Sequence, residues 1–237
     1  MFELKKQKLL VIAPHPDDEV LGCAGLIKKI KDNKGKVFIL FLTLADTKDF
    51  SKTSFSTSLQ REKEIKNVAK LLKFDDYDIA LRGSDYHLKL DRHGQFELMN
   101  LIERKSKVAI EKIRPTIIAF PDPDSYNQDH RLAARYTHAA LRPAAKENKH
   151  FVDTVLSYEM PADNWSLSPV REPDIFLPLS GSEMENKIKA WKLYKSQLRD
   201  APNPRSLKIV KDFASFRGSL AGCEYAECFR SHRILFK

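Results

Sequence analysis

Residues 8–30 have the sequence KLLVIAPHPDDEVLGCAGLIKKI, and this stretch decides the fold. The short apolar run from Lys8 to Ala13 predicts a buried strand, which ends at a proline followed by acidic residues. From Val20 to Ile30 the apolar residues recur at helical spacing, which predicts a helix packed on that strand. A strand that leads directly into a helix is the start of a βαβ unit, so the stretch predicts an α/β fold.

The same alternation continues along the chain. Further strands are expected at 37–44, 77–81, 116–120 and 154–158, and further helices at 59–72, 97–113, 129–141, 183–198 and 206–219. We therefore predict a Rossmann-like, mostly parallel sheet with right-handed crossovers, flanked by helices on both faces. After Pro161 the pattern is irregular, and only the last two helices are predicted there. No repeat or linker separates a second unit, so residues 1–237 are expected to form a single domain.

Composition is typical of a soluble globular protein, with 42% apolar and 31% charged residues in a chain of 237. No window approaches the roughly 18 apolar residues that span a bilayer, so no transmembrane segment is expected. Three cysteines cannot all pair within the chain and form no Cys-x-x-Cys, which indicates a reduced, cytoplasmic setting. The net charge of +9 is spread over several helices, as on an ordinary solvated surface, so no nucleic-acid partner is expected.

Polar segments follow three of the predicted strands. His15 to Glu19 follow the first, Asp46 follows the second, and 121–130 follow the strand at 116–120. Because ligands of open α/β sheets bind at the carboxyl ends of the strands, these segments are expected to meet at one edge of the sheet. That placement brings His130 to His15 and Asp18.

Two histidines and one carboxylate are a common ligand set for a catalytic divalent metal. His15 and Asp18 lie three residues apart in a strand-to-helix turn, where both side chains can reach one point. Asp17, between them, is free to act as a base on water whose pKa the metal lowers to about 7. In the alternative interpretation, Asp17 or Asp18 merely caps the helix and Pro16 fixes the turn, but one cap does not require a histidine and three consecutive acids.

Two motifs resemble a known family. Residues 13–25, APHPDDEVLGCAG, resemble the opening signature of the PIG-L/LmbE family of zinc-dependent N-acetylglucosaminyl deacetylases, and residues 127–131, NQDHR, resemble its His-x-Asp-His motif. Weaker similarity covers 61–64, 190–197 and 217–229. The resemblance implies that His15, Asp18 and His130 bind zinc and that Asp17 is the general base.

The resemblance also implies substrate-binding roles for Arg61 and Asp85. Arg61 would match a family arginine that contacts the substrate; the alternative is an i, i+3 ion pair with Glu64 on the helix surface. Asp85 would match a family aspartate near the sugar hydroxyls, although this chain has Tyr86 where the family usually has glycine.

The chain departs from the family at Asn127. Many members have a histidine there, partnered by the aspartate two residues on, which here is Asp129, and we assign both residues a catalytic role. Asparagine can donate a hydrogen bond to an oxyanion but cannot transfer a proton. Asp17 would then return the proton to the leaving amine. The other possible donors, each interpreted as a surface or structural histidine, are His87, His93 and His232.

The sequence therefore predicts a metal-dependent hydrolase that removes an N-acetyl group from an amino sugar or its conjugate. The metal is expected to be Zn²⁺, with Fe²⁺ as the alternative. The expected partner is a small-molecule N-acetylated sugar conjugate, and a homo-oligomer is possible. Two alternatives stay open: a metal-dependent amide or ester hydrolase of a non-sugar substrate, and a non-catalytic nucleotide- or polyanion-binding module. The stretch 159–178, with Trp165 among prolines, is a candidate substrate-facing loop.

Overall fold

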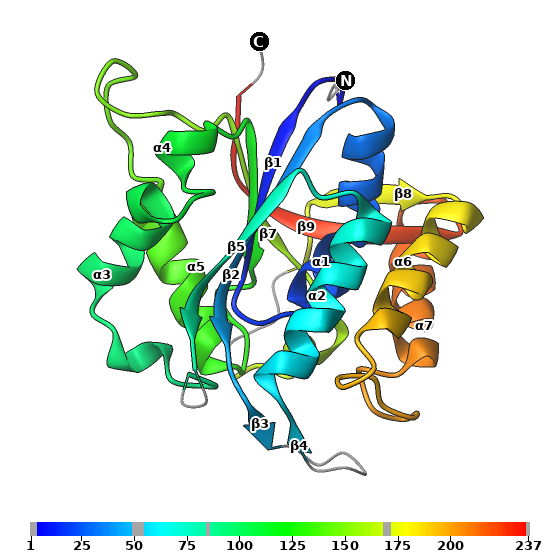
Figure 1. The fold of residues 1–237 in the computed structure, drawn as a ribbon. Coiled ribbons are helices and arrows are strands. Elements are labelled where there is room, and N and C mark those ends of the chain that lie inside the picture. Colours follow the sequence, from blue (N-terminus) through cyan, green and yellow to red (C-terminus); the bar gives the residue numbers. More distant parts are fainter. Residues whose placement is uncertain (1–3, 49–54, 84–85, 168–171, 236–237) are drawn as a thin grey trace.

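The computed structural model describes residues 4–48, 55–83, 86–167 and 172–235. Within these residues, a seven-stranded sheet has the strand order β5-β2-β1-β6-β7-β9-β8 (Figure 1). Its strands are β1 Lys8–Ala13, β2 Lys36–Leu44, β5 Asp76–Arg82, β6 Ile117–Pro121, β7 Thr154–Tyr158, β8 Ile175–Leu179 and β9 Tyr225–Ile234. The first five strands in the order are parallel, and β9 runs antiparallel to both β7 and β8. A short hairpin pairs β3 Thr47–Lys48 with β4 Phe55–Ser56.

Helices cover both faces of the sheet (Figure 1). One face carries α1 Asp18–Asp32, α2 Ser58–Leu72, α6 Gly181–Leu193 and α7 Leu207–Leu220. The other carries α3 Gln95–Asn100, the π-helical turn η2 Leu101–Lys105, α4 Ile110–Ile113 and α5 Gln128–Ala140. Two 3₁₀ turns, η1 Leu90–Arg92 and η3 Pro161–Asn164, complete the described elements. The predicted fold class is confirmed.

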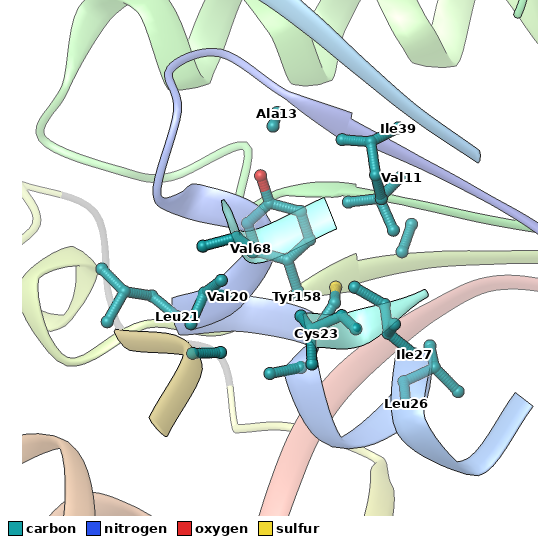
Figure 2. Close-up of a cluster of buried hydrophobic side chains, with 14 of the residues drawn as sticks. Val11, Ala13, Val20, Leu21, Cys23, Leu26, Ile27, Ile39, Val68 and Tyr158 are labelled. Atoms are coloured by element: carbon teal, nitrogen blue, oxygen red, sulfur yellow. The ribbon is translucent and has the colours of Figure 1, made fainter. Parts of the chain in front are cut away.

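The apolar run of β1 is continuous because the strand is buried on both faces. Leu9 and Val11 pack into the core beneath α1, whereas Leu10 and Ile12 pack into the core beneath α5. Successive side chains of a strand point to opposite faces, so both phases of the alternation must be apolar. Figure 2 shows Val11 and Ile39 on the α1 side of the sheet, facing Val20, Cys23 and Ile27 of that helix.

Tyr158 at the end of β7 fixes the close approach of α1 to the sheet. A Cβ atom at Gly22 would lie 2.3 Å from the Tyr158 ring, so only glycine fits at this point of the helix. The Tyr158 hydroxyl donates a hydrogen bond to the Ile12 carbonyl (3.0 Å), and Figure 2 shows its oxygen directed toward Ala13. This packing holds the N-terminus of α1 against the carboxyl end of β1.

One predicted helix is wrong. The segment 97–113 is interrupted between η2 and α4, because Ser106 Oγ and the Lys107 backbone N–H both donate to Asp78 Oδ2 (2.7 and 3.0 Å). The side chain of an aspartate on β5 thus provides partners that compete with the helical hydrogen bonds. Val108 and Ala109 are still buried after the break, so the apolar residues of this segment pack into the core although the helix is not continuous.

The antiparallel strands β8 and β9 were not predicted. β8 is a half-exposed edge strand that contains Pro178, which is tolerated there because an edge strand need not donate every backbone hydrogen bond. β9 interrupts its apolar residues with charged ones, among them Glu227 and Arg230. Among the described residues, no helix combines the length and apolar character needed to cross a membrane.

Candidate metal centre and active site

The turn between β1 and α1 holds two adjacent buried aspartates with different surroundings. Asp17 has φ 121° and ψ −29°, and its side chain makes no capping hydrogen bond. This backbone conformation is strained for a residue with a side chain. Asp18 turns back toward the sheet, where its Oδ2 accepts a hydrogen bond from the His15 backbone N–H (2.9 Å). Asp17 therefore occupies the N-cap position of α1, but its side chain does not cap the helix and that of Asp18 contacts His15 instead.

His15, Asp18 and His130 converge on one point, as expected from the sheet topology. Each offers a ligand atom, and these atoms all lie within 4.8 Å of one another. Asp18 Oδ2 is 3.4 Å from His15 Nδ1 and 3.4 Å from His130 Nε2. Asp18 Oδ1 and His130 Nε2 are buried without a hydrogen-bond partner among the residues that the structure describes. Convergent, buried and unsatisfied donor atoms of these types fit a divalent cation.

The other ring nitrogen of each histidine faces a carboxylate, through a hydrogen bond for His15 and through a longer ion-pair contact for His130. His15 Nε2 lies 3.1 Å from Asp129 Oδ2, and Asp129 Oδ1 accepts a hydrogen bond from the Leu90 backbone N–H (3.1 Å). His130 Nδ1 lies 3.5 Å from Asp163 Oδ1. Such carboxylate–histidine pairs fix the ring orientation of metal-ligating histidines, which leaves His15 Nδ1 and His130 Nε2 facing Asp18.

Asp163 was missed in the sequence, where only its loop was singled out. It belongs to η3, just beyond the carboxyl end of β7, and is 6% exposed. The rule that placed His130 at the edge of the sheet also applies to β7, so the signal was present in the sequence.

The two aspartates have pKa values shifted in opposite directions. Burial raises the pKa of Asp17 above 3.8, and the nearby Arg205 guanidinium only partly opposes this. Burial also acts to raise the pKa of Asp18, but the imidazoles of His130 and His15 outweigh it and hold that pKa well below 3.8. Adjacent carboxyl groups with diverging pKa values are suited to different roles, here a base and an ionised ligand.

The two histidines have raised pKa values. Burial acts to lower the pKa of His15, but its contacts with Asp129 and Asp18 raise it above 6.5. Burial also acts to lower the pKa of His130, but the negative charges of Asp18 and Asp163 outweigh it and raise that pKa well above 6.5. The protein therefore surrounds both rings with negative charge, an environment that also favours a bound cation.

Glu19 supports the turn from inside the core. Its Oε2 accepts a hydrogen bond from the Asp17 backbone N–H (3.0 Å), and its Oε1 accepts one from the Tyr194 hydroxyl (2.6 Å). Burial raises the pKa of Glu19 to about 8. The strained conformation of Asp17 is thus held by a side chain two residues along the same turn.

Two arginines flank Asp17. Arg61 on α2 is 2% exposed and donates from Nη2 to the Pro16 carbonyl (2.7 Å), so its interpretation as half of a surface ion pair is wrong. Glu64 instead accepts hydrogen bonds from the Ser196 backbone N–H and hydroxyl. Arg205 Nη2 lies 3.5 Å from Asp17 Oδ2. Arg205 was missed because it lies in the α6–α7 connection, where no periodicity or motif marks it.

Asn127 is the N-cap of α5, and its Oδ1 accepts a hydrogen bond from the Asp129 backbone N–H (2.9 Å). The residue lines a cleft together with Asp18, His130 and Arg205. The Asp129 carboxylate contacts His15 rather than the Asn127 side chain. Asp85, the other residue expected to bind substrate, lies outside the described residues.

Of the three remaining histidines considered as proton donors, only His87 lies beside this group. Its ring centroid is 5.5 Å from that of His15, and burial lowers its pKa to about 4, which keeps it neutral at pH 7. His87 is thus partly buried beside the site and is not a surface residue, while a structural role stays a prediction. His93 contacts Glu97 of α3, and His232 contacts Ser157 of β7.

Comparisons with known proteins identify the family of the chain. Residues 10–141, which include all three converging residues, match the family described as PIG-L: GlcNAc-PI de-N-acetylase. A diacetylchitobiose deacetylase of Thermococcus kodakarensis is 28% identical over 94% of this chain and 82% of that protein. A probable N-acetyl-alpha-D-glucosaminyl L-malate deacetylase 2 of Bacillus cereus is 24% identical over 90% of this chain and 94% of that protein. The structure of N,N′-diacetylchitobiose deacetylase from Pyrococcus horikoshii superposes with a TM-score of 0.72 at 23% identity, over 97% of this chain and 87% of that one.

Proposed function

Because the chain belongs to the PIG-L family of GlcNAc-PI de-N-acetylases, we propose that it is a zinc-dependent N-deacetylase of amino sugars or their conjugates. The observation that carries the proposal is the buried group of His15, Asp18 and His130 with the unbonded Asp17 carboxylate beside it. His15 Nδ1, one Asp18 oxygen and His130 Nε2 would hold the ion. The same donor set also accepts ferrous iron, so the metal is part of the proposal.

A divalent ion held there would act as a Lewis acid that polarises the acetyl carbonyl and lowers the pKa of water. Asp17 accepts the proton of the attacking water, a role suited to a carboxyl group whose pKa is raised by burial. The water oxygen bonds to the acetyl carbonyl carbon, the C–N bond then breaks, and Asp17 returns the proton to the amine nitrogen. Acetate and a free amino sugar leave.

Other residues of the site act on charge and orientation. Asn127 lines the cleft, and its Nδ2 amide can donate a hydrogen bond to the oxyanion of the tetrahedral intermediate. Asp129 acts through His15, whose ring it orients, and Asp163 acts in the same way through His130. Arg61 holds the turn at Pro16 and remains, with Asp85, a predicted contact of the substrate.

We also propose that residues 1–237 form one domain. The C-terminal strand β9 pairs directly with β7 of the parallel part, so the last third of the chain completes the sheet that begins with β1. The alternative of a polyanion-binding module is disfavoured because Asp17, Asp18 and Glu19 occupy the position where such a module would bind phosphate.

The proposal is tested with Asp17→Asn. The zinc-loaded variant is expected to keep one equivalent of metal by elemental analysis. Its turnover, measured as acetate release from N,N′-diacetylchitobiose and N-acetylglucosamine, is expected to fall by about 10³-fold, because the general base is lost. Asp32→Asn is the matched control, since this exposed aspartate lies at the other end of the same helix and should leave turnover unchanged.

Wild-type turnover in Asp17→Asn would overturn the mechanism. Release of acyl groups from N-acyl amino acids, without any release from N-acetylated sugars, would instead overturn the substrate class and keep the metal hydrolase.

A further inference from the structure

Two exposed aromatic rings stand at the rim of the cleft. Tyr126 is 49% exposed and Trp165 is 80% exposed, with ring centroids 5.8 Å apart and ring planes inclined by 42°. Tyr126 follows β6 and Trp165 follows β7, so both rings come from the edge of the sheet that carries the metal centre. Exposed apolar side chains that lie together, rather than singly, are typical of interaction sites and ligand-binding grooves.

The pair is continuous with the active site. Tyr126 precedes Asn127 and lines the same cleft as Asp18 and His130. Trp165 directly follows η3, whose residues Pro161 to Asp163 also line that cleft. A ligand that places its acetamido group at the three converging residues therefore meets these rings where it leaves the cleft.

Hydrogen bonds fix the positions of the two segments that carry the rings. Ser125 Oγ donates to Asp163 Oδ1 (2.5 Å), the same oxygen that faces His130. Ser166 Oγ donates to the Asp124 carbonyl (2.5 Å). Arg131 Nη1 donates to the carbonyl groups of Ser125 and Tyr126. The backbone beneath both rings is thus preorganised relative to a metal ligand, which reduces the ordering cost of binding.

The charge around the rings distinguishes between possible ligands. A neighbouring cleft is lined by four carboxylates, those of Asp122, Asp124, Glu159 and Asp163, and by Arg230. Glu159 is paired with Arg217, and the single Arg230 is paired with both Asp122 and Asp124, so the lining keeps a net negative charge and Arg230 offers no uncommitted positive charge. A phosphate or carboxylate group would be repelled here, whereas a neutral group would not. A pyranose ring is neutral, presents C–H groups on its face for contact with an aromatic ring, and keeps its hydroxyl groups in water at its edge.

We propose that Tyr126 and Trp165 form a stacking platform for a second, neutral sugar ring. The substrate is then an N-acetylated disaccharide or longer neutral glycan, whose acetylated end sugar enters the cleft while the next ring rests on the platform. The assignment of the end sugar rests on the proposed deacetylase function. The platform itself rests on the rings and the charge around them.

The test compares two substrates in one enzyme. For Trp165→Ala, the ratio of kcat/KM for N,N′-diacetylchitobiose to kcat/KM for N-acetylglucosamine is expected to fall about tenfold, mainly through a higher KM, because one ring contact is lost. Trp165→Phe should restore most of the ratio. Phe96→Ala, at an equally exposed aromatic residue of α3, is the control and should leave the ratio unchanged.

An equal loss on both substrates would overturn the platform and assign Trp165 a purely structural role. An unchanged ratio would overturn it as well. A loss seen only with an N-acetylglucosamine that bears an octyl chain would replace the sugar ring by an apolar aglycone.

Binding of cellobiose, a neutral disaccharide without an N-acetyl group, measured by calorimetry in wild type and in Trp165→Ala, separates this proposal from the proposed function. If wild type binds cellobiose more tightly than the variant but hydrolyses neither acetylated substrate, the deacetylase function fails and the platform stands. If wild type hydrolyses N-acetylglucosamine but binds cellobiose no better than the variant does, the platform alone fails.

Discussion

Helix α1 is contacted by buried charged side chains at two places. Against its middle, Lys187 of α6 donates to Glu227 Oε1 of β9 (2.7 Å) and to the Leu21 carbonyl (2.6 Å). The Glu227 carboxylate also accepts hydrogen bonds from the backbone N–H groups of Gly25 and Leu26 (2.8 and 2.9 Å). Lys187 and Glu227 are each 4% exposed, and both of them find their partners within the chain.

The N-terminus of the same helix is different. Both oxygens of Asp17, Oδ1 of Asp18 and Nε2 of His130 are buried without a hydrogen-bond partner in the described part of the chain. A structural ion pair of this protein is thus satisfied by its own backbone and side chains. At the proposed site, by contrast, the Asp17 carboxylate has the Arg205 ion pair at 3.5 Å but no hydrogen bond in the described part of the chain. In this protein, buried charged groups indicate a functional site only where their polar atoms lack hydrogen-bond partners within the described part of the chain.

The largest effect on stability is expected from breaking the buried Lys187–Glu227 ion pair. Lys187→Met leaves the buried Glu227 charge without its cation and should lower the free energy of unfolding by about 3–5 kcal/mol, measured by urea denaturation. The double variant with Glu227→Gln should recover part of this loss. Lys189→Met, which removes an exposed lysine of the same helix, is the control and should change stability by less than about 0.5 kcal/mol. A loss below 1 kcal/mol in Lys187→Met would show that the buried Glu227 carboxylate does not depend on Lys187 for its neutralisation.

A smaller effect on stability is expected from binding a metal ion to the group of His15, Asp18 and His130. Zn²⁺ at 100 times its dissociation constant should raise the free energy of unfolding of wild type by about 2.7 kcal/mol, because the ion binds the folded state. Asp18→Ala should lose this increment, and Lys187→Met should retain it, since its defect lies elsewhere on α1. Equal stabilisation of wild type and Asp18→Ala would contradict the ligand assignment.

The smallest effect concerns a third buried charge, on the other face of the sheet. Glu103 is 2% exposed, accepts a hydrogen bond from Arg142 (2.7 Å) and lies 3.3 Å from Lys149 Nζ. Burial acts to raise the pKa of Glu103, but Arg142 and Lys149 outweigh it and hold the pKa below 4.5. The ionised form is therefore favoured by folding, and its contribution is complete above pH 4.5 and is lost as the pH falls through the folded-state pKa.

Glu103→Gln tests this contribution. The difference in unfolding free energy between wild type and the variant should be on the order of 1 kcal/mol at pH 7, modest because Arg142 is half exposed. It should shrink as the pH is lowered below 4.5, as followed by urea denaturation across that range. A difference that stays constant with pH would mean that the charge of Glu103 does not contribute.

The parts of the fold and site that were predictable follow from local pattern and one topological rule. The parallel strands have continuous apolar runs because both faces are buried, and their order along the chain places His130 beside His15 and Asp18. The same rule applied to β7 would have indicated Asp163. Arg205 could not be predicted in this way, because the α6–α7 connection brings it to Asp17 without any periodic signal.

The remaining errors arise from tertiary contacts that oppose a local pattern. The helical spacing within 97–113 is real, but Asp78 of β5 binds the backbone and side chain at its middle and interrupts it. The run of β9 contains Glu227, whose charge belongs in the core only because Lys187 and the backbone of α1 meet it there. Neither partner is a sequence neighbour, so no window of the sequence contains the reason.

The backbone at Asp17 has a consequence for how this protein can be improved. Its φ of 121° suits glycine, and an aspartate there is expected to carry about 1–3 kcal/mol of conformational strain. Selection for thermostability alone would therefore favour Asp17→Gly, which relaxes the turn and removes the proposed base. A stabilisation campaign on this chain needs a turnover screen at every round, because at position 17 the most stable sequence and the active sequence are different ones.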